Sequence, residues 1–378
     1  MGNILNKLAP ARKDGTATGV AKIRYMELLY PDSNKFLIKD PYAYQFAAGS
    51  TLMRWLGFEM CHQLADSMPG LYESILCRTV FLDKHINQGI DNLNVTQVVI
   101  MGAGYDNRFY RLESIRNCKK KLTLIEVDQP EVQKKKKNGL KKMGVIDDKN
   151  TNCDQNSNLP EDAIESYGFT NLLIDDDLIE KGKLGNIQLS EIKKDPDQFC
   201  VQFCPCNFET MNFVDQIKKT DFDSSKKTIF VLEGLSQYVD KSALAKTISD
   251  IDALCDAPGS KILMSYVDNR SYDSSKVGEI CSDGGASTLD MIETVKKKKE
   301  PWVTGFDVDE TSKTYELQDW LMKNTNGNFS EDYTDQSWKE FNEKDLTPLG
   351  RNVYQFGKKK GNILPTFGVE RHVCVTRK

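Results

Sequence analysis

The chain has 378 residues, 39% hydrophobic and 28% charged, which suits one large α/β domain with additions or two modest domains. Its formal net charge of −4 excludes a general attraction to nucleic acid, and no apolar run approaches the roughly 20 residues that cross a bilayer. We expect a cytoplasmic protein, because Met1–Lys13 lacks the apolar core of a secretory signal and Asn6 does not fit a myristoylation signal.

The first part of the chain reads as helical. Val20–Leu29 and Leu71–Ile86 carry apolar residues three and four positions apart, and prolines at positions 31, 41 and 69 separate the helical stretches. We therefore predict that residues 1–90 form a helical N-terminal cap.

After residue 90 the pattern changes to short apolar runs that alternate with helical stretches. Lys241–Leu254, for example, is amphipathic and lies between two of these runs. The predicted strands are Val95–Met101, Leu122–Val127, Thr228–Leu232 and Lys261–Tyr266. Such alternation favours a mostly parallel sheet with helices on both faces, so we assign residues 91–378 to one α/β domain.

Two long stretches interrupt this alternation. Residues 147–197 are polar and look like a surface insertion of which little packs into the core, and residues 268–345 mix glycine, serine and charge. The lysine runs Lys134–Lys137 and Lys296–Lys299 are more typical of solvated helix faces than of nucleic-acid sites.

The chain has ten cysteines, and the tightest cluster is Cys200, Cys204 and Cys206. A zinc site would need a second cluster of Cys or His at a suitable spacing, and only three histidines exist. We expect reduced, buried thiols at the end of a strand, and no metal.

The strongest local signal is a glycine turn after the first strand, in VVIMGAGYDNR. Gly102 and Gly104 let the backbone approach a ligand, and in an open α/β sheet this turn lies at the carboxyl edge where ligands bind. A dinucleotide fingerprint would have a third glycine where this chain has Asn107. Taken alone, the pattern also fits a tight turn without a ligand.

The second strand ends in two acids. A carboxylate at the end of this strand can accept hydrogen bonds from both ribose hydroxyls of an adenosine ligand. Asp128 and Glu126 alternate along the strand and are both candidates, and each could instead cap the following helix.

Seven segments, in order, resemble the leucine carboxyl methyltransferase family, especially its branch of bacterial-type S-adenosylmethionine-dependent methyltransferases. The segments are GVAKIRYMELLYP, KDPYAYQFA, CRTVFLDKHI, VVIMGAGYDNRFYRL, LIEVDQPEVQKKK, FDSSKKTIFVLEGLSQYV and APGSKILMSYVD, between Gly19 and Asp268. The resemblance implies a Rossmann-like class I methyltransferase fold with a mostly parallel seven-stranded sheet, and S-adenosyl-L-methionine as cofactor.

The resemblance also assigns cofactor roles to matching positions. Arg78 corresponds to the arginine that binds the methionine carboxylate of the cofactor, for which its planar fork is suited. Gly102 corresponds to the glycine that packs against the cofactor, and Asp128, in preference to Glu126, to the ribose-binding acid. Glu233 corresponds to an acid near the amino-acid moiety.

One position departs from the family pattern. Relatives carry an Asp-Leu pair after the third strand, beside the adenine, and the matching pair here is Asn207-Phe208. The side-chain oxygen of Asn207 can still accept a hydrogen bond from the adenine amino group.

The implied activity is O-methylation of a carboxylate or hydroxyl on a small molecule or an exposed peptide terminus. Displacement at a sulfonium needs no acid, and an ionised carboxylate needs no base, so no catalytic residue is assigned. Tyr238, Arg108, Tyr105 and Tyr42 could line the acceptor pocket or simply pack in the core.

Three other functions fit parts of the pattern. A nicotinamide oxidoreductase shares the glycine turn and the following acid, but would need the third glycine. A catalytically silent module that binds S-adenosylmethionine as a sensor or partner would keep the same cofactor positions. Methylation of a protein phosphatase's terminal leucine is the best-known family activity, yet the chain resembles the bacterial-type branch more.

Overall fold

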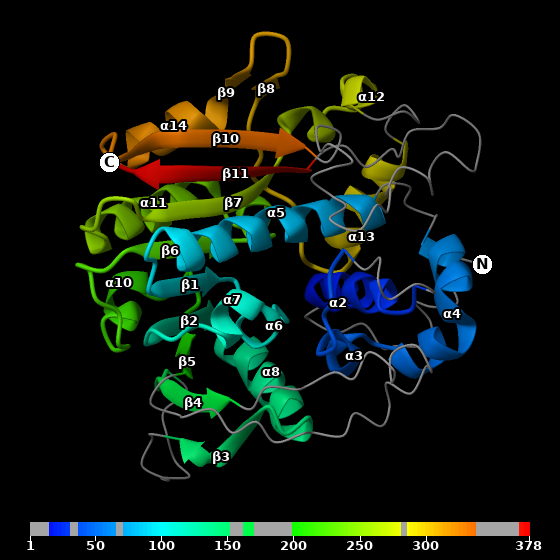
Figure 1. Ribbon diagram of the computed structural model, residues 1–378. Helices are drawn as coiled ribbons and strands as arrows, with labels where there is room; N and C mark the ends of the chain where they lie inside the picture. The colour runs from blue at the N-terminus through cyan, green and yellow to red at the C-terminus, as the bar shows by residue number, and fades with distance from the viewer. Residues whose placement is uncertain are drawn as a thin grey trace.

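Nine strands form the central sheet of the computed structural model, which describes residues 15–30, 37–65, 71–151, 162–169, 199–280, 286–337 and 370–378 (Figure 1). Within these residues the strand order is β10-β11-β7-β6-β1-β2-β5-β4-β3. The strands are β1 Gln97–Met101, β2 Leu122–Asp128, β3 Ile146–Thr151, β4 Glu165–Phe169, β5 Phe199–Pro205, β6 Thr228–Leu232, β7 Lys261–Val267, β10 Phe329–Ser337 and β11 Glu370–Arg377.

The centre of the sheet is parallel. Strands β5, β2, β1, β6 and β7 pair in parallel, β11 is antiparallel to β7, and β10 is antiparallel to β11. This part is the predicted seven-stranded sheet, and it confirms the Rossmann-like α/β fold. Two strands that the sequence did not predict, β4 and β3, extend the sheet by antiparallel pairing beyond β5.

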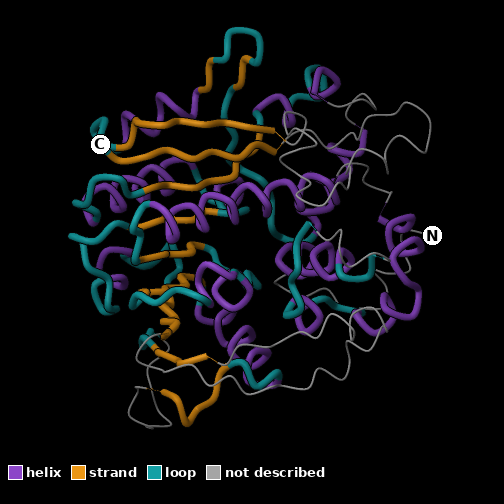
Figure 2. The backbone as a smooth tube through the Cα atoms, in the orientation of Figure 1, coloured by secondary structure: helices purple, strands orange, loops and turns teal. Residues whose placement is uncertain are grey.

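Helices cover both faces of the sheet, which Figure 2 shows as purple coils around orange strands. The longer helices are α2 Gly15–Glu27, α4 Ser50–Ala65, α5 Leu71–Asn92, α8 Pro130–Lys142, α11 Lys241–Leu254, α13 Ala286–Lys297 and α14 Glu316–Asn324. The short ones are α3 Ala43–Phe46, α6 Arg108–Arg111, α7 Glu113–Arg116, α10 Phe213–Ile217, η3 Ser236–Tyr238, η4 Asn269–Tyr272 and α12 Val277–Ile280. A separate hairpin consists of β8 Val308–Asp309 and β9 Thr314–Tyr315.

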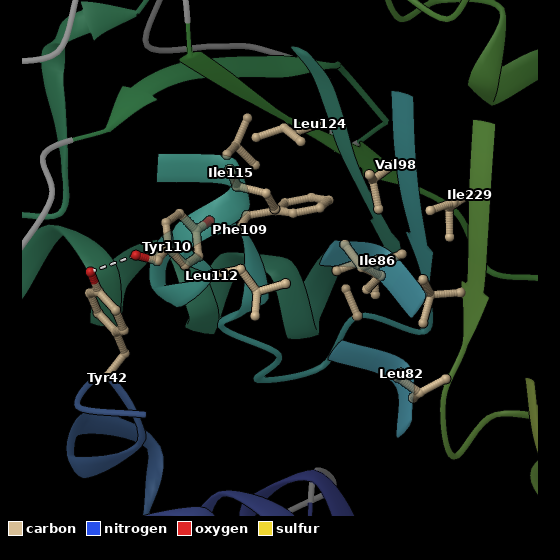
Figure 3. Packing of buried hydrophobic residues seen from close by; sticks show 14 of the residues in the cluster. Tyr42, Leu82, Ile86, Val98, Phe109, Tyr110, Leu112, Ile115, Leu124 and Ile229 are labelled. Atoms are coloured by element: carbon tan, nitrogen blue, oxygen red, sulfur yellow. Dashed lines mark hydrogen bonds between the residues drawn. The ribbon is translucent and has the colours of Figure 1, made fainter. Parts of the chain in front are cut away.

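Alternate residues of the strands enter two different cores. In β1, Val98 and Ile100 belong to one buried cluster, whereas Val99 and Met101 belong to the other. Because successive side chains of a strand point to opposite faces, a fully apolar strand serves both cores. Figure 3 shows part of the first core, where α5 packs over Val98 and Ile229.

The N-terminal helices also have a core of their own, in which Tyr25, Phe58 and Tyr72 are buried. The helix α5 connects this core to the sheet, because its residues Leu82 and Ile86 pack in the first sheet core. The division of the chain at residue 90 therefore remains a proposal.

The predicted polar insertion contains core residues. Tyr167 and Phe169 of β4 are buried in the first sheet core, although we expected little of residues 147–197 to pack there. The polar surroundings hide this short strand from a composition-based reading. Residues 152–161 and 170–198 lie outside the described residues, so the limits of the insertion remain a prediction.

Cys204 and Cys206, at the end of β5, are buried thiols as expected, whereas Cys200, near the start of the strand, is only partly buried. Burial raises the pKa of Cys204 to about 12 and that of Cys206 to about 11, so both are protonated at neutral pH.

In the described part of the chain no helix is long and apolar enough to cross a membrane.

A histidine of α5 makes stability depend on pH. Burial, with smaller contributions from Lys261 and Lys84, lowers the pKa of His85 from 6.5 to about 4. A folded-state pKa below the unfolded one means that the unfolded chain takes up the proton first, so stability falls as the pH drops from about 6.5 towards 4. The His85→Gln variant should lose less stability than the wild type between these pH values, by at most about 3 kcal/mol in the free energy of unfolding. Denaturant titrations of both proteins across this pH range measure the difference. An unchanged pH slope in this variant would contradict the prediction.

Candidate active site

A cavity of about 900 Å³ opens at the carboxyl ends of the parallel strands. Its wall includes residues of α2, α5 and α13, and α2 and α13 lie beyond one end of the strands (Figure 1). Strand β1 pairs with β2 on one side and β6 on the other, so the chain order reverses here, which is where ligands bind in open α/β sheets. Four of the predicted cofactor residues line the cavity: Arg78, Gly102, Asp128 and Glu233.

The glycine turn has the backbone that only glycine adopts readily. Gly102 has φ +66° and Gly104 has φ +44°. A Cβ at position 102 would lie 3.1 Å from Cδ1 of Leu235, so a larger residue would have to displace this side chain slightly as well as adopt an unfavourable backbone conformation. The backbone N–H of Gly104 donates to Asp128 at 2.6 Å, which joins the turn to the end of β2.

Asn107, in place of the third glycine, anchors the turn to the N-terminal segment. It is fully buried, and its side-chain Nδ2 donates to both carboxylate oxygens of Asp40, at 3.0 and 3.1 Å. The residue that departs from the dinucleotide fingerprint thus has a structural contact.

The structure separates the two acids of β2. Asp128 lines the cavity and accepts hydrogen bonds from the backbone N–H groups of Gly104 and Gln129, both at 2.6 Å. Glu126 lies in the core, where it pairs with Lys136 at 2.6 Å, and burial raises its pKa to about 7 despite this partner. Lys136 is likewise buried, so our assignment of the whole Lys134–Lys137 run to a solvated face is wrong at this position.

Arg78 is held between two carboxylates. Its Nε donates to Glu233 at 2.8 Å and its Nη1 to Glu370 of the C-terminal strand at 2.5 Å. Ser74, one turn earlier in α5, donates to the other oxygen of Glu370 at 3.3 Å. Nη2 of Arg78 has no hydrogen-bond partner among the described residues, so one guanidinium nitrogen remains for a ligand.

Arg108 belongs to the same network of ion pairs, because it also pairs with Glu233. It is fully buried and pairs with Asp83 at 2.7 Å, and also with Asp106 and Glu233. Burial disfavours the charged form of Glu233, but Arg108, Arg78 and Arg24 outweigh it and lower the pKa of this acid. The pKa of Asp106 is also lowered, because the charge of Arg108 outweighs the effect of burial on this acid. Both acids are therefore anionic at neutral pH.

Arg24 is a cavity residue that the sequence reading missed. Its Nη2 donates to the backbone oxygen of Tyr105 at 3.0 Å and its Nε lies 3.5 Å from Asp40. Nη1 is buried without a hydrogen-bond partner among the described residues, although Arg24 lines the cavity. The signal in the sequence was an arginine inside the apolar helix GVAKIRYMELL, a position that is costly unless the charge has a partner.

The predicted adenine pair lies beside the cavity. Asn207 and Phe208 are not among the described residues that line it, although Glu209 is. The Asn207 oxygen accepts from the Glu209 backbone N–H at 3.0 Å, and the Phe208 ring packs against Phe213. An adenine contact by either residue remains a proposal.

Two of the four candidates for the acceptor pocket line the cavity, namely Tyr238 and Tyr105. Tyr105 also stacks on Phe46, with ring centroids 4.6 Å apart. The other two are core residues: Arg108 is the centre of the ion-pair network, and the Tyr42 hydroxyl donates to the Tyr110 backbone at 3.0 Å (Figure 3).

The part of the cavity beyond Glu233 is mostly apolar. Val267, Val295 and Trp302 form one buried cluster, against which Leu71, Met291 and Tyr238 pack. All six also line the cavity. The sequence reading treated residues 268–345 as irregular and did not predict that they contribute a wall of the site.

Comparison with known proteins places the chain among methyltransferases. A family model described as leucine carboxyl methyltransferase matches residues 17–252. A relative from Mycolicibacterium smegmatis, named as an S-adenosyl-L-methionine-dependent methyltransferase, is 26% identical over 267 residues, which are 68% of this chain and 67% of that protein.

Other similarities are shorter or more distant. A relative of the same description from Mycolicibacterium paratuberculosis is 33% identical over 140 residues, and the match spans 34% of this chain and 41% of that protein. The solved structure of a DUF574 family protein from Streptomyces avermitilis has a TM-score of 0.46 at 9% identity, covering 97% of this chain and 100% of the other.

Proposed function

This chain belongs to the leucine carboxyl methyltransferase family, and from that premise we propose that it methylates a carboxylate oxygen of its acceptor. It is an S-adenosyl-L-methionine-dependent methyltransferase. The acceptor chemistry is our inference from the cavity.

The cavity residues fit the cofactor. Nη1 of Arg24 and Nη2 of Arg78 are donors without partners among the described residues. The positive charges of both arginines also lower the pKa of Glu233, which lines the same cavity. They suit the methionine carboxylate, to which each would donate one hydrogen bond. The Gly102 turn admits a close approach of the ligand, and Asp128 suits the ribose hydroxyls. When bound, the cofactor supplies a methyl group on a positively charged sulfur.

The observation that carries the proposal is that, among the described residues, the acids around Arg78 are held in ion pairs and are not free to act as a base. Asp106 is paired with Arg108, Glu233 with both arginines, and Glu370 with Arg78. Of the other acids on the cavity wall, Asp128 accepts two backbone hydrogen bonds and Glu300 accepts one from the Thr16 N–H at 3.2 Å. No histidine of the described residues lines the cavity, and burial raises the pKa of Tyr238. A hydroxyl acceptor would need a base beside it, whereas a carboxylate is ionised at neutral pH and needs none.

The reaction then requires only alignment. A carboxylate oxygen of the acceptor forms the new O–C bond, the C–S bond breaks with its electron pair going to sulfur, and the products are a methyl ester and S-adenosylhomocysteine. No proton moves in this step. The residues hold the two reactants in line and exclude water, which is worth roughly 7–11 kcal/mol of the barrier.

Two measurements test this function. Calorimetry should show binding of S-adenosylmethionine and S-adenosylhomocysteine but not of NAD. Release of S-adenosylhomocysteine should then be stimulated by carboxylic acids and not by the matched alcohols. Stimulation by alcohols alone would overturn the carboxylate proposal, and binding without turnover of any acceptor would favour the catalytically silent module.

Asp128→Asn should weaken cofactor binding with little change in fold. The substitution keeps the shape but removes the charge that strengthens hydrogen bonds from the ribose. We expect a cost of on the order of 1–3 kcal/mol, or roughly five- to 150-fold in affinity by calorimetry. Glu126→Gln is the matched control, because Glu126 is on the same strand but does not line the cavity among the described residues. Equal losses in both variants would contradict the assignment of Asp128.

A further inference from the structure

Among the described residues of the cavity wall, Gln237 has a buried side-chain oxygen without a hydrogen-bond partner. The residue is only 4% exposed, and the oxygen is its Oε1. A buried amide oxygen without a partner costs free energy, so its presence beside a cavity calls for an explanation, and a bound ligand that donates to it is one.

Backbone contacts fix Gln237 between the cofactor end and the apolar end. On one side Gly234 N–H donates to Ser265 at 2.8 Å, and a Cβ on this glycine would lie 3.6 Å from Arg78. On the other side the Val303 N–H donates to the backbone oxygen of Gln237 at 2.7 Å. Only two residues therefore lie between the glycine beside Arg78 and Gln237, whose backbone is bonded to the segment next to Trp302.

The surroundings of Gln237 define what could satisfy it. The apolar residues of the cavity wall include Val267, Met291 and Trp302, and Lys298 and Glu300 add charges to the same wall. The volume of about 900 Å³ lies near the upper end for a single-ligand site, roughly 300–1,000 Å³, and so leaves room for a small acceptor beside the cofactor. A carboxamide both donates and accepts, so its complement is a hydroxyl or an amide.

We propose that Gln237 determines acceptor specificity, and that the acceptor is a carboxylic acid with an apolar body and a hydroxyl or amide group close to the methylated carboxylate. This inference rests on the proposed carboxylate methylation. The apolar wall takes the body of the acceptor, and Gln237 selects against acids that leave its amide unpaired.

Three acids with the same body and carboxylate test the proposal: 3-phenylpropanoate, 2-hydroxy-3-phenylpropanoate and N-acetylphenylalanine. Their binding to the full-length protein saturated with S-adenosylhomocysteine is measured by calorimetry, and methyl esters are detected by mass spectrometry. The wild type should bind the hydroxy or acetamido acid on the order of tenfold or more tightly than the unsubstituted acid.

Gln237→Met keeps the length of the side chain and removes its hydrogen bonding, so the affinity ratio should fall to about one. Gln237→Leu serves if the methionine variant does not fold. Thr294→Val is the matched control, because Thr294 also lines the cavity but comes from α13, and this variant should keep the wild-type ratio.

Three outcomes would overturn the inference. The first is an affinity ratio of one in the wild type, and the second is an unchanged ratio in Gln237→Met. The third is that none of the three acids binds to the S-adenosylhomocysteine complex. Failure of the proposed function has a different signature: a methyl ether in place of the ester, with the affinity ratio still dependent on Gln237. Binding of S-adenosylhomocysteine itself is the internal check and should be equal in all four proteins.

Discussion

Arg108→Met is expected to lower the free energy of unfolding by about 3–5 kcal/mol, the usual cost of removing one partner from a buried ion pair. Arg108 has no exposed surface, and it pairs with Asp83, Asp106 and Glu233. Glu233 would keep Arg78 and Asp83 would keep Arg111, but Asp106 would lose its main compensating charge. Urea unfolding followed by circular dichroism at pH 7 measures the loss.

The control for this prediction is Lys246→Met. Lys246 is 63% exposed and pairs with Asp250 in α11 at 2.6 Å, so its removal should change stability by less than about 0.5 kcal/mol. Similar losses in the two variants would mean that burial does not govern the strength of the Arg108 network. An Arg108→Met loss under about 1 kcal/mol would contradict the structure around Glu233.

Arg78→Met should weaken cofactor binding and also destabilise the protein. The loss of stability should again be about 3–5 kcal/mol, because Glu233 and Glu370 are buried on either side of the guanidinium group. Calorimetry at low temperature, where the variant is still folded, should show S-adenosylhomocysteine binding weakened by roughly 10-fold or more, since a charged hydrogen bond is lost.

Two further variants separate the roles of Arg78. Arg78→Lys keeps a charge for the two acids but loses the planar fork, so both effects should be smaller. Glu370→Gln leaves Arg78 in place and removes one of its buried partners, and it should reduce stability more than affinity. Full stability of Arg78→Met with lost binding would show that Arg78 serves only the ligand.

The buried ion pairs explain why these effects could not be predicted from the sequence. Arg78 is 155 residues from Glu233 and 292 residues from Glu370 in the sequence. No local pattern therefore indicates that the C-terminal strand pairs with α5. From the family resemblance we expected the planar fork of Arg78 to bind the methionine carboxylate of the cofactor. The tertiary fold instead places two carboxylates on it, so that one nitrogen and not a two-pronged fork remains for a ligand.

The sequence by itself determined the parts that depend on local pattern. The apolar runs predicted β1, β2, β6 and β7, and the glycine turn and the strand-end acid located the cavity, because the carboxyl ends of parallel strands share one edge. The ordered motifs predicted the family, which the family match confirms.

Only the tertiary structure decided which chemically equivalent residues reach the cavity. Glu126 and Asp128 are both acids on β2, but Glu126 is enclosed with Lys136 whereas Asp128 meets the glycine turn. Arg24 and Gln237 had no motif to mark them, and they become candidates because burial leaves their polar atoms unpaired beside a cavity. The apolar sequence around Arg24 indicates that this charge is buried, but the partners of a buried polar group and its place beside a cavity depend on long-range packing.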